Sequence, residues 1–181
     1  SSPPLVGVDC DQRSLQEATR HTGVARGDFF ALPFRGAYFA GAFAWYSALF
    51  TFDDSAQLPL FREVARVLKP GGRLFFQHVP LTYAKQRAPS LHVDTLEDGC
   101  RVGDHVRYDA TRKRDLGVRS LVEPGGRTLE ATYEIRYYAT EALEELLGRA
   151  GMKVLFLHGG SDGRALSGQS IELIVGAERE Q

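Results

Sequence analysis

The sequence predicts an α/β fold: a doubly wound, mostly parallel sheet with an inserted antiparallel β hairpin. Three observations lead to this prediction. The chain opens on a short apolar run at residues 5–8 that ends at an acid. An amphipathic segment at 58–68 stops at a Lys-Pro-Gly-Gly turn, and an apolar run follows directly, which indicates helix, turn and strand in that order. Residues 82–138 are instead polar and alternating, which is typical of antiparallel strands.

The first βα unit is expected at the start of the chain. Leu5–Val8 is short and apolar, as a strand buried on both faces would be, and Asp9 closes it. Asp11 stands where a helix N-cap is preferred, and Leu15 begins the apolar positions at helical spacing. The next buried strand is expected at about residues 41–45, within a stretch dense in apolar and aromatic side chains.

The second half of the core is expected to end in a helix and two strands. After the helix at 58–68, the run RLFFQHV predicts a strand. TEALEELLGRA predicts a helix with Thr140 as a candidate N-cap and Gly151 just beyond its end, and the strands MKVLFLH and SIELIVGA follow around a glycine-rich loop. One domain, residues 1–181, with a β-rich segment inserted at 82–138 around a Pro-Gly-Gly turn, accounts for the chain.

The composition of the chain indicates which kinds of partner it can bind. The net charge of −1 over 181 residues provides no basic field of the kind that nucleic-acid or anionic-membrane binding relies on. No apolar run is long enough to span a bilayer. Cys10 and Cys100 are the two cysteines and lack the spacing of a metal site or a disulfide framework. We therefore expect a cytoplasmic protein with a small-molecule partner and no metal, and the sequence leaves a homodimer open.

Several segments resemble the class I S-adenosylmethionine-dependent methyltransferases. LFREVARVLKPGGRLFF, at 60–76, is similar to the family's helix, Leu-Lys-Pro-Gly-Gly turn and fifth strand. VGVDCDQRSL, GDFFALPF and AFAWYSALFTF resemble its second strand, acidic loop and fourth strand, and TEALEELLGRAGMKVLFLHG its last helix and sixth strand. The resemblance covers nearly the whole chain. It implies a Rossmann-like fold with S-adenosylmethionine as cofactor, and YEIRYY in the insert narrows it to small-molecule enzymes with an antiparallel lid.

The resemblance assigns cofactor-binding roles at the ends of the strands. Asp9 would accept hydrogen bonds from the ribose diol, with Cys10 beside it; the alternative is that Asp9 caps the next helix together with Asp11. Asp28 would accept from the adenine amino group, and the Phe29 N–H would serve a ring nitrogen. An isolated Gly-Asp pair would otherwise indicate a turn.

Two aromatic residues extend this set. Trp45 and Tyr46 end the predicted fourth strand, where the family places residues that touch the methionine part of the cofactor or the substrate. Aromatic side chains are also common in cores, and for Trp45 the two interpretations have equal weight.

Candidate catalytic and substrate-binding residues follow the fifth strand and lie in the insert. His78 is a candidate general base, although a lone histidine at a strand end is more often a hydrogen-bonded structural residue. Tyr108, Arg136 and Tyr138 are candidates to bind a substrate acid or stack on a ring, but an exposed hairpin would have the same composition.

The family's first strand and glycine-rich loop have no counterpart in the sequence. We expect them to lie upstream of Ser1, so that strand two pairs directly with strand four or another segment fills the place between them. The predicted function is methyl transfer to nitrogen or oxygen of a small molecule. Two alternatives stay open, a non-catalytic methyltransferase-like binding or scaffold protein and an inactive fragment of a methyltransferase.

Overall fold

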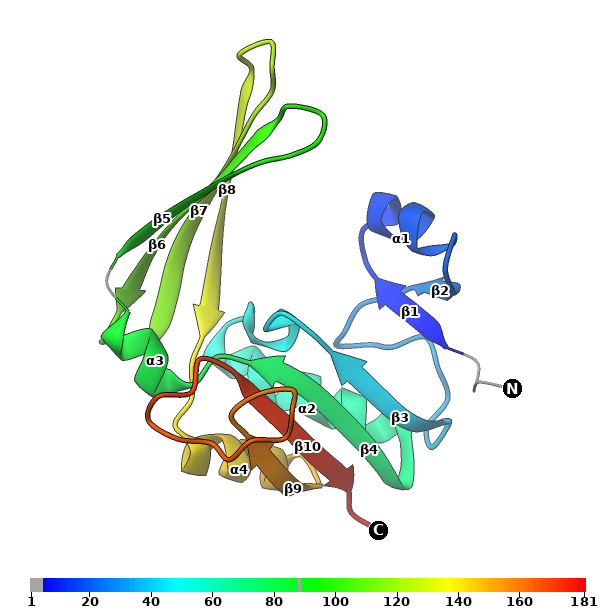
Figure 1. Ribbon diagram of the computed structural model, residues 1–181. Helices are drawn as coiled ribbons and strands as arrows, with labels where there is room; N and C mark the ends of the chain where they lie inside the picture. Colours follow the sequence, from blue (N-terminus) through cyan, green and yellow to red (C-terminus); the bar gives the residue numbers. More distant parts are fainter. Residues whose placement is uncertain (1–4, 88) are drawn as a thin grey trace.

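The computed structural model describes residues 5–87 and 89–181 as three sheets with four α-helices (Figure 1). A parallel pair consists of β1 (Val6–Asp9) and β2 (Gly23–Arg26). The core sheet has the order β3 (Phe39–Ala44), β4 (Leu68–His78), β10 (Leu173–Arg179) and β9 (Met152–His158). The antiparallel sheet, which we call the lid sheet, consists of β5 (Ser90–Thr95), β6 (Arg101–Asp109), β7 (Arg114–Val122) and β8 (Thr128–Arg136).

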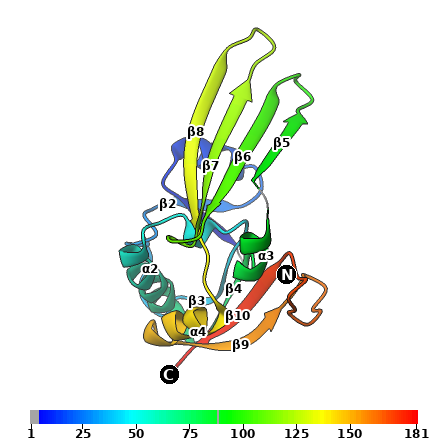
Figure 2. The same ribbon diagram turned by 90° about the vertical axis from the view of Figure 1, so that its left-hand side faces the viewer.

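The helices connect these sheets and build the core. They are α1 (Gln12–Ala18), α2 (Asp54–Val67), α3 (Leu81–Gln86) and α4 (Thr140–Arg149), and a 3₁₀ turn covers Ala48–Phe50. Figures 1 and 2 show α2 and α4 on the same face of the core sheet. Apolar side chains of both helices pack there against β4 and β10, and the fully buried ones include Leu60, Phe61, Leu143, Leu147, Phe76 and Val175. No helix in the described ranges is long and apolar enough to cross a bilayer.

Most predicted elements are confirmed, with shifted ends. Asp11 caps α1 through a bond from the Ser14 N–H (2.9 Å), and Gly151 follows α4 with φ of 79°. The expected N-cap at Thr140 is wrong by one residue, because the backbone is already helical at Thr140 and extended at Ala139. The helix expected at 58–68 begins earlier, at Asp54, and contains Pro59 at the cost of one backbone hydrogen bond.

Two features differ more from the prediction. β2 was not expected, because its four residues are too short to carry a pattern and gain order only by pairing with β1. The core sheet is only partly parallel: β3 and β4 are parallel, whereas β10 is antiparallel to both β4 and β9. The cause is the connection from β9 to β10, a loop without a helix, which returns the chain in the opposite direction.

The predicted hairpin in the insert is part of a larger sheet. β7 and β8 are joined by the expected turn, in which Gly126 has φ of 84° and donates its N–H to the Glu123 carbonyl (2.9 Å). β5 and β6 extend it to four strands. Figure 2 shows this lid sheet extending away from the core sheet, with its base toward α3.

β1 and β3 each pair along one edge only among the described residues. β1 pairs with β2, β3 pairs with β4, and the two sheets remain separate. Direct pairing of these two strands, one of the expected outcomes, is therefore not observed. Figure 1 shows β1 and β3 running in the same direction on either side of the space between the sheets.

Hydrogen exchange should reveal these one-sided edges. In β1 and β3, the backbone N–H groups on the unpaired edge of each strand should exchange their hydrogen with solvent at nearly unprotected rates. Amides of the doubly paired strands β4 and β10 should exchange at least about a thousandfold more slowly, because they open only with much of the core. The edge strand β9 is the matched control, with the same half-protected pattern expected. Equal protection of both edges of β1 and β3 would instead mean that another strand occupies the space in solution.

Candidate active site

The carboxyl ends of β1, β3 and β4 all point toward the lid sheet (Figure 1). Asp9 is the last residue of β1, Trp45 follows β3, and His78 is the last residue of β4. Ligands of open α/β sheets bind at such strand ends. The fold therefore brings three of the segments predicted from the sequence to one side of the molecule.

Asp9 and Asp28 lie beside each other at this side. The Gly27 N–H donates to the Asp9 carbonyl (3.1 Å), which joins the end of β1 to the loop that carries Asp28. One carboxylate oxygen of Asp9, Oδ1, accepts from the Asp11 N–H (2.8 Å), so Asp9 does support the turn into α1. Its other oxygen, Oδ2, accepts no hydrogen bond from the described residues. Cys10 is exposed, and its carbonyl accepts from the Arg26 side chain (3.1 Å).

The loop of Asp28 is held in place by two hydrogen bonds and an aromatic contact. Asp28 Oδ1 accepts from the Phe30 N–H (2.9 Å), and its carbonyl accepts from the Ala31 N–H (3.0 Å). The rings of Phe29 and Phe30 meet Phe52 edge to face, with centroids 6.2 and 5.0 Å away. The loop is thereby fixed to the segment between β3 and α2.

Trp45 and Tyr46 are exposed rather than buried in the core. Their exposed fractions are 41% and 86%. Tyr46 and Ser47 both have positive φ, 53° and 58°, which is uncommon for residues other than glycine and costs of order 1 kcal/mol each. β4 holds this turn, because the Ser47 N–H donates to the Gln77 carbonyl (3.2 Å) and Ser47 Oγ lies 2.9 Å from His78 Nδ1.

His78 is completely buried. Its ring stacks on Phe50 at 4.0 Å between centroids and on Tyr137 at 5.2 Å. Burial lowers its pKa to about 3, so the ring is neutral at physiological pH. With Nδ1 at Ser47 and both faces covered, His78 has the geometry of the structural alternative and none of the access that a general base needs.

A cavity of about 590 Å³ lies between the lid sheet and the start of α2. Its lining comes from β6, β7 and β8 and from the segment after β3, and comprises Thr51, Asp53, His105, Arg107, Arg112, Arg114, Leu116, Gly117, Val118, Thr132, Tyr133 and Glu134. We call it the lid cavity. Its volume is within the range of small-molecule sites.

Comparison with known proteins agrees with this geometry. Residues 3–72 match a family model described as a methyltransferase domain. The structure superposes on a S-adenosylmethionine-dependent methyltransferase from Clostridium acetobutylicum with a TM-score of 0.84 and 15% identity, over 99% of this chain and 76% of the other. The chain therefore has the class I methyltransferase fold.

Two further proteins are similar to this chain over nearly its whole length. The CcbJ methyltransferase from Streptomyces caelestis has a TM-score of 0.81 at 18% identity and matches 98% of this chain and 80% of its own. The cypemycin N-terminal methyltransferase from Streptomyces sp is 25% identical over 182 residues, which cover 97% of this chain and 74% of the relative.

The predicted substrate residues Tyr108, Arg136 and Tyr138 are not among those that line the lid cavity. Tyr108 lies in register with Asp115 and Ile135 on the opposite face of the lid sheet, where it packs near Tyr137. Burial raises the pKa of Tyr108. Tyr138 is half-buried against Phe50, with centroids 6.0 Å apart.

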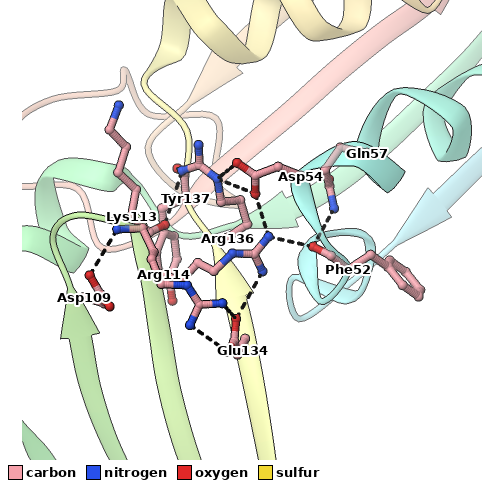
Figure 3. A network of polar contacts seen from close by, with 10 residues as sticks. Phe52, Asp54, Gln57, Asp109, Lys113, Arg114, Glu134, Arg136 and Tyr137 are labelled. Atoms are coloured by element: carbon pink, nitrogen blue, oxygen red, sulfur yellow. Dashed lines mark hydrogen bonds and ion pairs between the residues drawn. The ribbon is translucent and has the colours of Figure 1, made fainter.

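Arg136 is held by an ion-pair network at the base of the lid (Figure 3). Asp54, in the first turn of α2, accepts from Arg136 (3.0 and 3.1 Å) and from the buried Arg114 (2.6 Å). Burial acts to raise the pKa of Asp54, but the hydrogen bond from Arg114 and the charge of Arg136 outweigh it and lower the pKa. Arg136 therefore joins the lid sheet to α2.

Sequence reasoning missed several residues that line the cavity, although it included Arg107 and Tyr133, which also line it, among the possible substrate-binding residues of the insert. Asp53, His105, Leu116 and Thr132 received no role. The alternation of side chains along β6 contains the signal, because His105 and Arg107 share one face while Tyr108 takes the other. Without the register of the neighbouring strands, neither face could be assigned to the cavity.

Proposed function

We propose that this protein transfers a methyl group from S-adenosylmethionine to a nitrogen or oxygen of a small molecule. The main support for this proposal is the position of the segment 51–53. The short segment 51–53 contacts both parts of the site: Phe52 packs on Phe29 and Phe30 in the loop of Asp28, while Thr51 and Asp53 line the lid cavity. A cofactor at Asp9 and Asp28 and an acceptor in the lid cavity would thus meet across this segment.

The residues at the strand ends fit the cofactor chemically. Asp9 keeps one carboxylate oxygen without a partner among the described residues, which suits a ribose hydroxyl. Asp28 likewise uses Oδ1 for the Phe30 N–H, and Oδ2 accepts no hydrogen bond there, which leaves it for an exocyclic amine. When bound, S-adenosylmethionine supplies an activated methyl carbon on a sulfonium, which is already a good leaving group.

The protein itself would contribute to the reaction by positioning the two reactants. S-adenosylmethionine would supply the methyl group and keep the electron pair of the broken carbon–sulfur bond, while the acceptor would supply the lone pair for the new bond and release its proton to water. The Tyr46–Ser47 turn, fixed by β4, and the lid sheet, fixed by Asp54, would hold the two reactants in line and exclude solvent. His78 takes no part in proton transfer in this proposal.

A nitrogen acceptor is favoured over oxygen. The cypemycin N-terminal methyltransferase and the sugar N-methyltransferase KedS8 from Streptoalloteichus sp both act on nitrogen according to their names. The KedS8 structure has a TM-score of 0.72 at 17% identity over 97% of this chain and 71% of its own. An amine needs no strongly basic residue once it is deprotonated, and the described part of the cavity offers no buried base.

Replacing Asp9 by Asn should weaken binding of S-adenosylhomocysteine about tenfold or more. The amide keeps an oxygen for the Asp11 N–H but loses the charge that strengthens bonds to the ribose diol. Isothermal titration calorimetry of the wild type and the variant measures this directly.

Asp11→Asn is the matched control, because Asp11 is an exposed acid two residues away that caps α1 through Ser14. Its affinity for S-adenosylhomocysteine should equal that of the wild type. Equal affinity of the Asp9 variant would remove Asp9 from the site. No binding to the wild type at all would argue against the proposed function and favour the two alternatives, a scaffold protein or an inactive fragment.

A further inference from the structure

The floor of the lid cavity is an apolar strip between two polar margins. In the register of the lid sheet, Leu116 on β7 lies between Arg107 on β6 and Glu134 on β8. In the neighbouring row, Val118 lies between His105 and Thr132. An acceptor lying across the strands would therefore meet apolar surface at its middle and polar groups at its ends.

Most charges around the cavity neutralise one another. Arg112 makes a bidentate pair with Glu134 (3.0 and 2.7 Å), and the buried Arg114 is bonded to Asp54 (2.6 Å). Such pairs have little capacity left for a ligand, because breaking them would leave a partner charge unpaired.

Two cavity charges remain without an opposite charge within 4.0 Å among the described residues: Arg107 and Asp53. Both side chains are exposed to the cavity solvent. Arg107 projects from β6 at one side of the apolar strip. Asp53 precedes α2 and makes no side-chain cap bond to it, so helix capping does not explain its carboxylate. Among the described residues, the cavity thus offers one cation and one anion that are not held in an ion pair, although Arg107 lies near Asp109 and Asp53 near Arg112.

We propose, on the basis of the methyl-transfer function above, that the acceptor is a zwitterion with an apolar middle, such as an amino acid or short peptide. Its acid group binds Arg107, where a guanidinium can hold a carboxylate through two hydrogen bonds. Its amine binds at Asp53 as the ammonium and must release one proton to the solvent in the cavity before its lone pair can accept the methyl group. Its apolar middle rests on Leu116 and Val118.

The orientation follows from the position of Asp53. Asp53 belongs to the same segment after β3 that carries Trp45 and Tyr46, on the side of the proposed cofactor site. The amine is therefore the end of the acceptor that faces the methyl donor. Arg107, on β6, binds the other end of the acceptor and sets which molecules are accepted.

Trialanine is a suitable probe, because three extended residues span about 10 Å, similar to two inter-strand spacings across the cavity floor. We would titrate the protein with trialanine, its C-terminal amide and its N-acetyl form, and follow amide chemical shifts by NMR. The wild type should bind trialanine about tenfold more tightly than either capped form, the loss expected for one charge-assisted contact.

Two variants test which residue binds each end of trialanine. Arg107→Met should abolish the preference over the C-terminal amide and keep the preference over the N-acetyl form, and Asp53→Asn should do the reverse. Arg101→Met is the matched control, because Arg101 lies on the same strand and face of β6 but outside the cavity lining, and both preferences should survive.

Equal binding of the three peptides, or no shift of cavity amides with any of them, would overturn the zwitterion proposal. A parallel titration with S-adenosylhomocysteine separates this result from failure of the function itself. Cofactor binding without a charge preference would refute only the acceptor class. A charge preference without cofactor binding would refute methyl transfer while supporting the acceptor site.

Discussion

Replacing Asp115 by Ala should destabilise the protein by about 3 kcal/mol, because it removes the acid at the centre of a buried cluster. The Asp115 side chain is 2% exposed and accepts from the Tyr137 hydroxyl (2.6 Å) and from Arg87. Burial, and then the bond to Asp115, raise the pKa of Tyr137, so its hydroxyl is a permanent donor. The variant leaves a guanidinium and a buried hydroxyl without their acceptor. Urea unfolding monitored by circular dichroism measures the change.

Asp104→Ala is the control for this prediction. Asp104 lies on the same sheet and also pairs with an arginine, Arg119 (2.8 Å), but the arginine side chain is 59% exposed. Its removal should cost less than about 1 kcal/mol. Adding Arg87→Met to Asp115→Ala should recover part of the loss, since the unpaired cation is removed. If both aspartate variants lost the same stability, the Asp115 cluster would not anchor the base of the lid.

The core was predictable where sequence patterns are local. The amphipathic stripe of α2, the Gly151 end of α4 and the Pro-Gly-Gly hairpin turn each depend on residues a few positions apart, and each formed as expected. β2 and the antiparallel direction of β10 depend instead on pairing between distant segments, and no local pattern encodes that pairing.

The same distinction between local patterns and distant pairing applies to the candidate site. Asp9 was predicted from its position at the end of a strand, and Asp28 from the resemblance of its loop to the family's acidic loop. Their roles in cofactor binding stay predictions. In the lid, Tyr108 packs near Tyr137 and Arg136 is held in ion pairs, whereas Asp53 and His105 line the lid cavity. Tyr138 lines a second cavity, of about 470 Å³, beside α3 and the start of α4. The roles predicted for these three residues in substrate binding stay predictions. Composition located the lid correctly but could not tell its two faces apart, because a shift of one residue exchanges them.

His78 should make the protein progressively less stable as the pH falls below about 6.5. Its pKa is about 3 in the folded protein, chiefly through burial, and about 6.5 when unfolded. The neutral ring is the folded form, so its contribution is fully present above pH 6.5 and is lost as the pH falls toward 3. The loss amounts to about 1.4 kcal/mol per pH unit, or about 2 kcal/mol between pH 7 and pH 5. Urea unfolding at the two pH values measures it.

The test is the difference between wild type and His78→Phe, because carboxylates that titrate in both proteins cancel. Phenylalanine can keep the stacking on Phe50 and Tyr137 but carries no titratable nitrogen. The variant should therefore gain about 2 kcal/mol relative to the wild type when the pH is lowered from 7 to 5. His21→Gln, at an exposed histidine, should show no such gain. A pH-independent difference for His78→Phe would mean that the ring is accessible to protons in the folded state, and the general-base role that its burial argues against would regain support.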